Sequence, residues 1–251
     1  MTRIFTQAGE EAPPIDEDAV VDFFEARARK VGDLGPLKAV LYQDKHADLA
    51  ERRDVAEKAV IFPILELSDA SRVLDAGCGV GRWAALVRGT GAYYHGADVS
   101  SGLIKVAQET YGNDDKIRFS VCAIDTLSLE QLQETAPFTH LVCFGVFIYL
   151  NDPTLKIALR RLVEMAAPKA RIVFREPLSS GGRLTLSEHF SEDMDQVYHA
   201  IYRSENEFLA EKTAILGATG FKLCRSGDVY ANHELNNRRE TRQRYFVWER
   251  G

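Results

Sequence analysis

Short apolar runs recur along the middle of this chain, and their spacing predicts buried strands that alternate with helices. The first run, Val73-Leu74, leads into a glycine-rich turn and then a helix, all within residues 72–83. Similar runs predict strands at 93–99, 117–122, 139–144, 171–174, 221–224 and 244–248. This alternation is typical of an α/β protein with a doubly wound sheet.

The turn after the first strand is rich in glycine, and its spacing points to a nucleotide-like ligand. Gly77, Gly79 and Gly81 permit positive φ angles and a close approach of the backbone to a ligand. A dinucleotide-binding turn has the spacing G-x-G-x-x-G, whereas this one is G-x-G-x-G with Arg82 in the third glycine place. The spacing favours S-adenosylmethionine over a dinucleotide. A turn without any ligand is the alternative that this motif alone leaves open.

Two later strand ends carry residues suited to the rest of such a cofactor. Asp98 closes the second predicted strand 21 residues after Gly77, the spacing expected of a carboxylate that accepts both ribose hydroxyls. The third predicted strand leads into Ala123-Ile124-Asp125, where a small residue, an aliphatic residue and an acid suit an adenine ring. The fourth predicted strand, 139–144, leads directly into residues 145–149.

From about residue 50 to 176, these motifs resemble the class I S-adenosylmethionine-dependent methyltransferases that act on small molecules. The resemblance implies a Rossmann-like sheet of seven strands, parallel except for the last, with S-adenosylhomocysteine as the product. It also implies that Arg82 pairs with the methionine carboxylate and that an arm folds over the cofactor. The expected cofactor-binding residues are Tyr42, Arg53, Gly77, Cys78, Gly79, Arg82, Asp98, Val99, Ala123, Ile124, Asp125 and Phe144.

Segments outside the strands are expected to provide the arm and a lid. Apolar residues at helical spacing from Asp18 to Lys30 predict a helix, whereas residues 1–15 form a polar run typical of a loose arm. The stretch from Leu184 to Glu211 is too long for an ordinary connection and predicts a lid after the fifth strand. We expect one domain with an N-terminal arm or cap (1–55), a cofactor-binding core (56–177), a substrate lid (178–215) and final strands (216–251).

Candidate acceptor-side residues gather at the carboxyl end of the fifth strand and in the lid. Arg175, Tyr198, Tyr202 and Arg203 are expected to form a polar wall for an acidic or sugar-like group, although the spacing of the two tyrosines also suits plain packing. A hydroxyl acceptor benefits from a general base. The candidate catalytic residues are Glu176, His199 and Tyr149, and His140 and His189 stay open as alternatives.

The composition limits which classes of molecule this protein is expected to bind. The net charge of −6 argues against a nucleic-acid binder, and the basic cluster Arg238, Arg239, Arg242 and Arg244 is interpreted as a solvated strand edge. No apolar run reaches the roughly 20 residues of a membrane span, and the first residues lack a signal-peptide pattern. Cysteine spacing implies no metal. We expect a cytoplasmic protein, a monomer or homodimer, without a membrane or nucleic-acid partner.

The sequence therefore predicts an enzyme that transfers a methyl group to an N or O atom of a small polar molecule. Two alternatives remain open at this stage. One is an NAD-dependent oxidoreductase that uses the same turn and Asp98, against which Arg82 and the lack of a second half-fold argue. The other is a domain that binds S-adenosylmethionine without catalysis, because a fold does not guarantee a function. The acceptor itself is not specified by the sequence.

Overall fold

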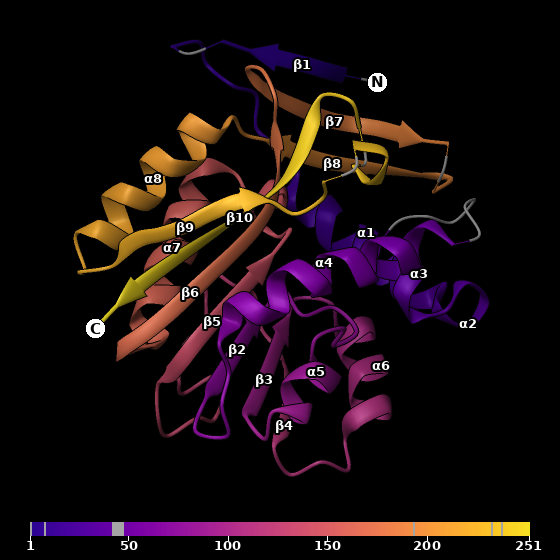
Figure 1. The fold of residues 1–251 in the computed structure, drawn as a ribbon. Coiled ribbons are helices and arrows are strands. Elements are labelled where there is room, and N and C mark those ends of the chain that lie inside the picture. Colours follow the sequence, from indigo (N-terminus) through magenta and orange to yellow (C-terminus); the bar gives the residue numbers. More distant parts are fainter. Residues whose placement is uncertain (1, 8, 42–47, 193, 232, 237) are drawn as a thin grey trace.

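Seven strands of the described residues form one mixed sheet in the computed structural model, in the order β4-β3-β2-β5-β6-β10-β9 (Figure 1). The structure describes every residue except 1, 8, 42–47, 193, 232 and 237. The strands are β2 (Arg72–Ala76), β3 (Tyr93–Asp98), β4 (Ile117–Val121), β5 (Phe138–Phe144), β6 (Ala166–Ser179), β9 (Lys222–Asp228) and β10 (Thr241–Arg250). Each predicted strand is present, and the predicted doubly wound α/β fold is confirmed.

Strand direction in this sheet also agrees with the prediction. β2 is parallel to β3 and β5, while β4 and β6 extend the parallel part on either side. β10 lies between β6 and β9 and is antiparallel to both. Its Phe246 stands opposite Phe174 of β6 and Ser226 of β9. The last strand in the sequence is therefore the one that runs against the others.

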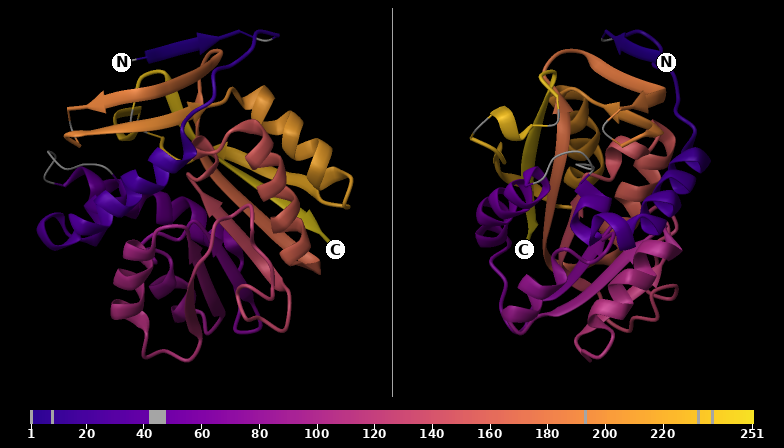
Figure 2. Two further views of the ribbon diagram at one scale, coloured as in Figure 1. Left: turned by 180° about the vertical axis from the view of Figure 1, so that it is seen from behind. Right: turned by 90° about the vertical axis from the view of Figure 1, so that its right-hand side faces the viewer.

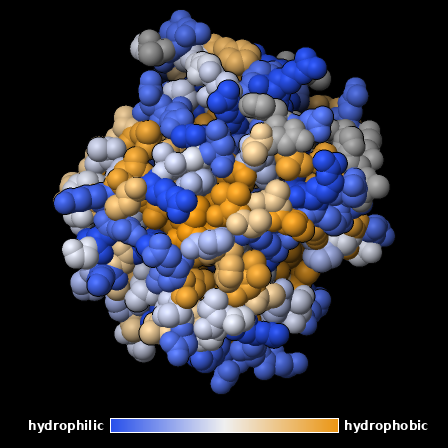
Figure 3. Space-filling view, viewed as in Figure 1, coloured by the Kyte–Doolittle hydropathy of each residue, from blue (hydrophilic) through white to orange (hydrophobic). Residues whose placement is uncertain are grey.

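Helices cover both faces of the sheet (Figure 2). Buried residues of α7 and α8 pack on one face, and those of α4 and α5 pack on the other. Figure 3 shows apolar side chains gathered in the middle of the face that α4 crosses. The helical segments are α1 (Glu17–Arg29), α2 (Val31–Leu34), α3 (Pro36–Leu41), α4 (Leu49–Leu65), α5 (Ala84–Gly89), α6 (Ser101–Tyr111), η1 (Phe147–Tyr149), α7 (Asp152–Met165), α8 (Glu205–Gly217) and η2 (His233–Leu235). Within the described residues, none of these is long and apolar enough to cross a membrane.

The sequence of α7 explains its place on the sheet. Pro153 stands in its first turn, where a missing N–H costs no helical bond. Leu155, Leu159 and Leu162 recur at three- and four-residue spacing and are fully buried. This apolar stripe fixes the helix that follows η1 and so holds the segment after β5 in place.

A second, three-stranded antiparallel sheet in the order β1-β7-β8 lies beyond the carboxyl end of β6 (Figures 1 and 2). Its strands are β1 (Thr2–Thr6), β7 (Arg183–Ser191) and β8 (Gln196–Tyr202). The prediction of a loose arm is wrong for residues 2–6, because Phe5 pairs with Leu184 and extends the sheet. The segment expected to form a lid, 178–215, contains the β7–β8 hairpin and most of α8.

The hairpin shares a hydrophobic core with the predicted N-terminal helix. Phe23 of α1 packs near Tyr198 of β8, with ring centroids 6.2 Å apart. Asp16 begins α1 by accepting a hydrogen bond from the N–H of Ala19. Glu17 then accepts the N–H of Asn151, which anchors the helix to the segment after η1. α1 is thereby joined to both the lid and the main sheet.

Candidate functional site

A cavity of about 340 Å³ opens at the carboxyl ends of the central strands. This is where the chain order reverses, between β2 with β3 on one side and β5 with β6 on the other, which is the usual ligand position in doubly wound folds. α1 and β8 contribute to its wall from the lid side. The cavity therefore extends from the glycine turn to the lid.

The glycine turn approaches the opposite wall so closely that a side chain would not fit. Gly77 has a φ of 82°, and a Cβ there would lie 2.2 Å from Cγ2 of Val146. The backbone N–H of Gly79 donates to Oδ2 of Asp98 at 2.8 Å. These contacts leave a shallow backbone cradle that lines the cavity and suits a closely bound ligand.

Asp98 lies at the end of β3 and faces this cradle. Its second oxygen, Oδ1, accepts the N–H of Ser100 at 2.9 Å, and Ser100 in turn caps α6. Burial raises the pKa of Asp98, while the hydrogen bonds from Ser100 and Gly79 act in the opposite direction. The carboxylate is thus fixed in direction, with its remaining lone pairs available to a ligand in the cavity.

Most of the predicted cofactor-binding residues line this one cavity. Those that do are Arg53, Gly77, Cys78, Gly79, Arg82, Asp98, Val99, Ala123, Ile124, Asp125 and Phe144. Tyr42 lies outside the described residues. Residues from five separate segments of the chain are therefore brought together as the motifs implied, although no contact with a cofactor tests their individual roles.

A buried charge cluster lies beside the glycine turn. Glu57 of α4 pairs with Nη2 of Arg82 at 2.7 Å and with Nη2 of Arg175 at 3.0 Å. Burial would raise the pKa of Glu57, but the charges of Arg175 and Arg82 outweigh it and hold the pKa below its usual range. Arg82 also binds Asp54 at 2.6 Å. A guanidinium has five N–H donors, so these bonds still leave donors for the carboxylate that the resemblance assigns to Arg82.

Asp75 lines the cavity as well, and sequence reasoning missed it. It is 1% exposed and accepts the hydroxyl of Tyr94 at 2.6 Å. Burial raises its pKa to about 7, in spite of that hydrogen bond. The available signal was an acid inside an otherwise apolar strand, directly before the glycine turn.

The lid end of the cavity is lined by several of the predicted acceptor-side residues. Tyr149, Arg175, Tyr198 and Tyr202 all face it. The ring of Tyr149 meets Phe24 of α1 edge-on at a centroid distance of 5.1 Å. Aromatic rings from the main sheet, the lid and the arm thus form a common wall.

His199 is not among the residues that line the cavity. Its Nδ1 accepts the N–H of Glu188 within the hairpin. Side chains alternate across a strand, so Tyr198 and Tyr202 point to one face of β8 and His199 to the other. His199 is therefore not placed to act as a general base in this cavity, and His140 and His189 likewise do not line it.

Glu176 is also absent from the lining and has a different role. Its Oε1 accepts the N–H groups of Val146 and Phe147 at 2.9 and 3.0 Å, at the start of η1. Burial raises its pKa, with these hydrogen bonds opposing the rise. These hydrogen bonds favour a positioning role for Glu176, on the segment that carries Tyr149, over the predicted role of general base, which stays a prediction.

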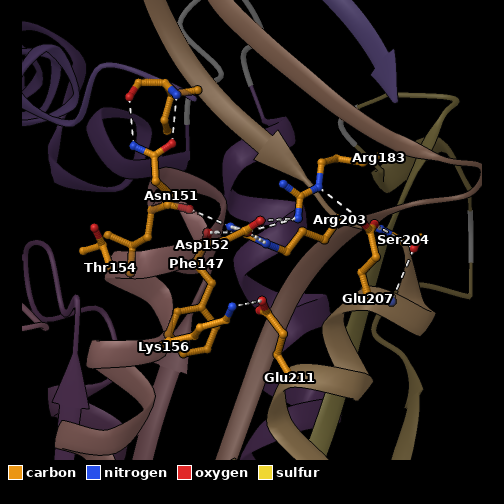
Figure 4. A network of polar contacts seen from close by, with 12 residues as sticks. Phe147, Asn151, Asp152, Thr154, Lys156, Arg183, Arg203, Ser204, Glu207 and Glu211 are labelled. Carbon is orange, nitrogen blue, oxygen red and sulfur yellow. Dashed lines mark hydrogen bonds and ion pairs between the residues drawn. The ribbon is translucent and has the colours of Figure 1, made fainter. Parts of the chain in front are cut away.

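Arg203 follows β8 and is 2% exposed, away from the cavity lining. It donates to the carbonyl oxygens of Phe147 and Leu150, each at 2.7 Å, and to Asp152 at 2.6 Å. Figure 4 shows Arg183 of the lid turned toward the same carboxylate, which it binds at 2.8 Å. The prediction of Arg203 as a substrate contact is wrong, because its donors are used to join the lid to η1 and α7.

Arg238 corrects the interpretation of the C-terminal basic cluster. It lines the cavity together with Tyr230 and Gln243, and its guanidinium hydrogen-bonds the hydroxyl of Tyr198. Arg239 is exposed, as expected of a solvated edge. The spacing of these arginines in the sequence does not predict which of them lines the cavity. That depends on how the loop before β10 packs against β8.

Comparisons with known proteins agree with this geometry. Residues 73–169 match the sequence profile of the family described as "Methyltransferase domain". The methyltransferase GfsG of Streptomyces halstedii is 26% identical over 176 residues, which are 63% of this chain. That match spans only 61% of the length of the relative.

Solved structures share the fold at low identity. The magnesium protoporphyrin IX methyltransferase of Synechocystis PCC 6803, with bound S-adenosylmethionine, has a TM-score of 0.61 at 19% identity, covering 96% of this chain and 100% of that chain. The 1,6-didemethyltoxoflavin-N1-methyltransferase of Burkholderia thailandensis has a TM-score of 0.64 at 16% identity, covering 100% and 99%. The predicted resemblance is confirmed at the level of the fold: the chain has the class I S-adenosylmethionine-dependent methyltransferase fold, and residues 73–169 match the methyltransferase-domain family.

Proposed function

We propose that this protein transfers the methyl group of S-adenosylmethionine to an N or O atom of a small polar molecule. One observation carries the proposal. The glycine cradle, Asp98 and the Ala123-Ile124-Asp125 segment line the same cavity as Tyr149, Tyr198 and Tyr202 of the lid end. A cofactor half and an acceptor half thus share one cavity, as a direct transfer between two small molecules requires.

The residues of the cofactor half fit S-adenosylmethionine. Asp98 has oxygens suited to the ribose hydroxyls, Asp125 suits the adenine amino group, and Arg53 and Arg82 suit the methionine carboxylate. The cradle at Gly77 has no room for a side chain, which supports a ligand held close to the backbone. When bound, the cofactor supplies an electrophilic methyl group on a positively charged sulfur.

The residues of the acceptor half position and desolvate the acceptor. Rings of Tyr149 and Phe24, with Met194 beside them, exclude water from the lid end of the cavity. Holding two reactants in line is worth about 7–11 kcal/mol of activation free energy. Of the predicted base candidates, Tyr149 is the one that lines the cavity, so a hydroxyl acceptor would meet its phenol. An amine acceptor needs to arrive unprotonated.

The relatives support a small molecule as the acceptor. The Burkholderia thailandensis neighbour was solved with 1,6-didemethyltoxoflavin and S-adenosylhomocysteine. A Haemonchus contortus neighbour was solved with phosphoethanolamine and S-adenosylhomocysteine, at 16% identity and a TM-score of 0.68, covering 94% of this chain and 50% of that chain. A free small molecule also suits the net charge of −6 better than a nucleic acid does.

Two measurements test the proposal. Calorimetry should show S-adenosylhomocysteine binding at micromolar levels and no binding of NADH, and labelled S-adenosylmethionine should transfer its methyl group into a small-molecule extract. Binding of NADH in place of S-adenosylhomocysteine would support the oxidoreductase alternative. Cofactor binding without transfer into any fraction would support the non-catalytic domain.

A further inference from the structure

The basic residues at the cavity differ in what balances their charge. Arg82 and Arg175 share the carboxylate of Glu57, so each is part of a buried ion pair. Arg238 instead hydrogen-bonds the hydroxyl groups of Tyr198 and Tyr202, which are neutral. This guanidinium therefore brings a positive charge to the lid end of the cavity.

No acid of the described chain neutralises this charge by direct contact. The ion pairs around the same loop join Glu240 to Arg3 and Asp228 to Arg244, and none in the described residues joins a carboxylate to Arg238. The charge of Arg238 also affects a neighbouring histidine. Burial, and after it the charge of Arg238, lowers the pKa of His189, whose ring packs 5.4 Å from that of Tyr198.

Aromatic and apolar side chains share the cavity with Arg238, although the carboxylates of Glu17 and Asp18 also line it and that of Glu240 lies near enough to interact with its charge. Its guanidinium carbon lies 5.7 Å from the centroid of the Tyr198 ring. Phe24, Tyr149 and Met194 line the same cavity from α1, η1 and the β7–β8 turn. A half-buried cation with two phenol hydroxyls beside it is suited to bind an anion through charge-assisted hydrogen bonds.

We propose that Arg238, with the hydroxyls of Tyr198 and Tyr202, binds an anionic oxygen group of the methyl acceptor, and that the acceptor is an acid with an apolar ring body. This inference rests on the proposed function, since it assigns the acceptor half of the same cavity. Both phenol hydroxyls accept from Arg238 and also hydrogen-bond each other, which leaves one hydroxyl proton to donate to the bound anion. The apolar wall holds the ring, and Arg238 sets its orientation relative to the cofactor half.

The test compares matched probes on the full chain saturated with S-adenosylhomocysteine. Calorimetric or ligand-observed NMR titrations would use 4-hydroxybenzoate, its neutral isostere 4-hydroxybenzamide, and acetate as an anion without a ring. We expect the ring acid to bind at least tenfold more tightly than either of the others. Arg238→Gln should weaken the ring acid by about tenfold to a hundredfold and leave the amide unchanged. Arg239→Gln, at the exposed neighbouring position, should change neither.

Several results would overturn the inference: equal binding of the acid and the amide, binding of neither, acetate binding as tightly as the ring acid, or the same loss in Arg238→Gln and Arg239→Gln. Arg238→Lys provides a second variant, which should keep part of the acid preference because it keeps the charge. The cofactor titration distinguishes the two proposals. If S-adenosylhomocysteine binds and the acid preference is missing, this inference alone fails, whereas failure to bind S-adenosylhomocysteine removes the proposed function.

Discussion

Asp98 is the residue at which the glycine turn, the end of β3 and the cavity meet. Its two oxygens are oriented by the N–H groups of Gly79 and Ser100 before any ligand arrives. A carboxylate oriented in this way binds hydroxyl groups without a further loss of side-chain entropy. Cofactor affinity should therefore depend strongly on this side chain.

If Asp98 binds the ribose as we propose, replacing it by Ala removes two charge-assisted hydrogen bonds to the cofactor. We expect S-adenosylhomocysteine to bind about tenfold to a hundredfold more weakly, corresponding to roughly 1.5–3 kcal/mol. Isothermal calorimetry measures the change, and Asp115→Ala, at an exposed position after α6, serves as the control. An unchanged affinity in Asp98→Ala would remove the ribose role from this residue.

Residues at strand ends were the most predictable part of the site. Gly77, Asp98 and Asp125 follow apolar strands directly, so a local pattern places them at the carboxyl edge of the sheet. Asp75 and Arg238 were missed for different reasons. Asp75 looks like part of its strand, and Arg238 reaches the cavity only through packing between segments about 40 residues apart.

At the scale of elements, β8 shows what the spacing of residues alone can predict. Tyr198 and Tyr202 share a face because a four-residue spacing does so in a strand as well as in a helix. The sequence thus placed both tyrosines together correctly without specifying the element. The strand assignment places His199, one residue after Tyr198, on the opposite face of β8.

The segment from β5 to η1 gives a sharp test of the role of Glu176. Its Oε1 accepts the N–H groups of Val146 and Phe147, and the side-chain oxygen of a glutamine can accept both. We expect Glu176→Gln to keep kcat/KM within about tenfold of wild type, whereas Glu176→Ala should lose both stability and acceptor turnover. Steady-state kinetics and urea unfolding provide the two readouts.

A general base at this position gives the opposite pattern. Glutamine cannot accept a proton from the acceptor, so Glu176→Gln would then be as inactive as Glu176→Ala while remaining as stable as wild type. That result would contradict the positioning role assigned from the hydrogen bonds.

At the scale of the whole molecule, Asp75 makes folding stability depend on pH. Its pKa is about 7 in the folded protein and about 3.9 in an unfolded chain. Between these values the unfolded chain releases the proton and the folded protein retains it, so stability falls as the pH rises. Below about pH 4 both states hold the proton, and above pH 7 the effect levels off.

Asp75→Asn tests this dependence, because an amide oxygen can still accept the hydroxyl of Tyr94. Relative to this variant, we expect the wild type to lose up to about 4 kcal/mol of unfolding free energy between pH 4 and pH 8. Urea unfolding at several pH values measures the difference. A difference that stays constant across that range would mean that Asp75 titrates normally.

Long-range pairing limited what the sequence could predict about the whole fold. Local apolar runs indicate the strands of the main sheet, and each of these strands was predicted from the sequence. β1 contains only five residues, Thr2–Thr6, and its partner β7 begins at residue 183. Four of these five residues, Thr2, Ile4, Phe5 and Thr6, favour strands, but their pairing depends on a sheet edge formed much later in the chain.

The position of β10 has a consequence for how the protein is made. β10 follows β9 in the chain but lies between β9 and β6 in the sheet. While the chain is being translated, β9 therefore has no partner, and the edge of β6 that carries Phe174 stays open until residues 241–250 emerge from the ribosome. Gln243, which lines the cavity, belongs to that segment. Until β10 pairs with both strands, the sheet has an open edge on which other chains can pair, and the cavity lacks the wall that Gln243 provides.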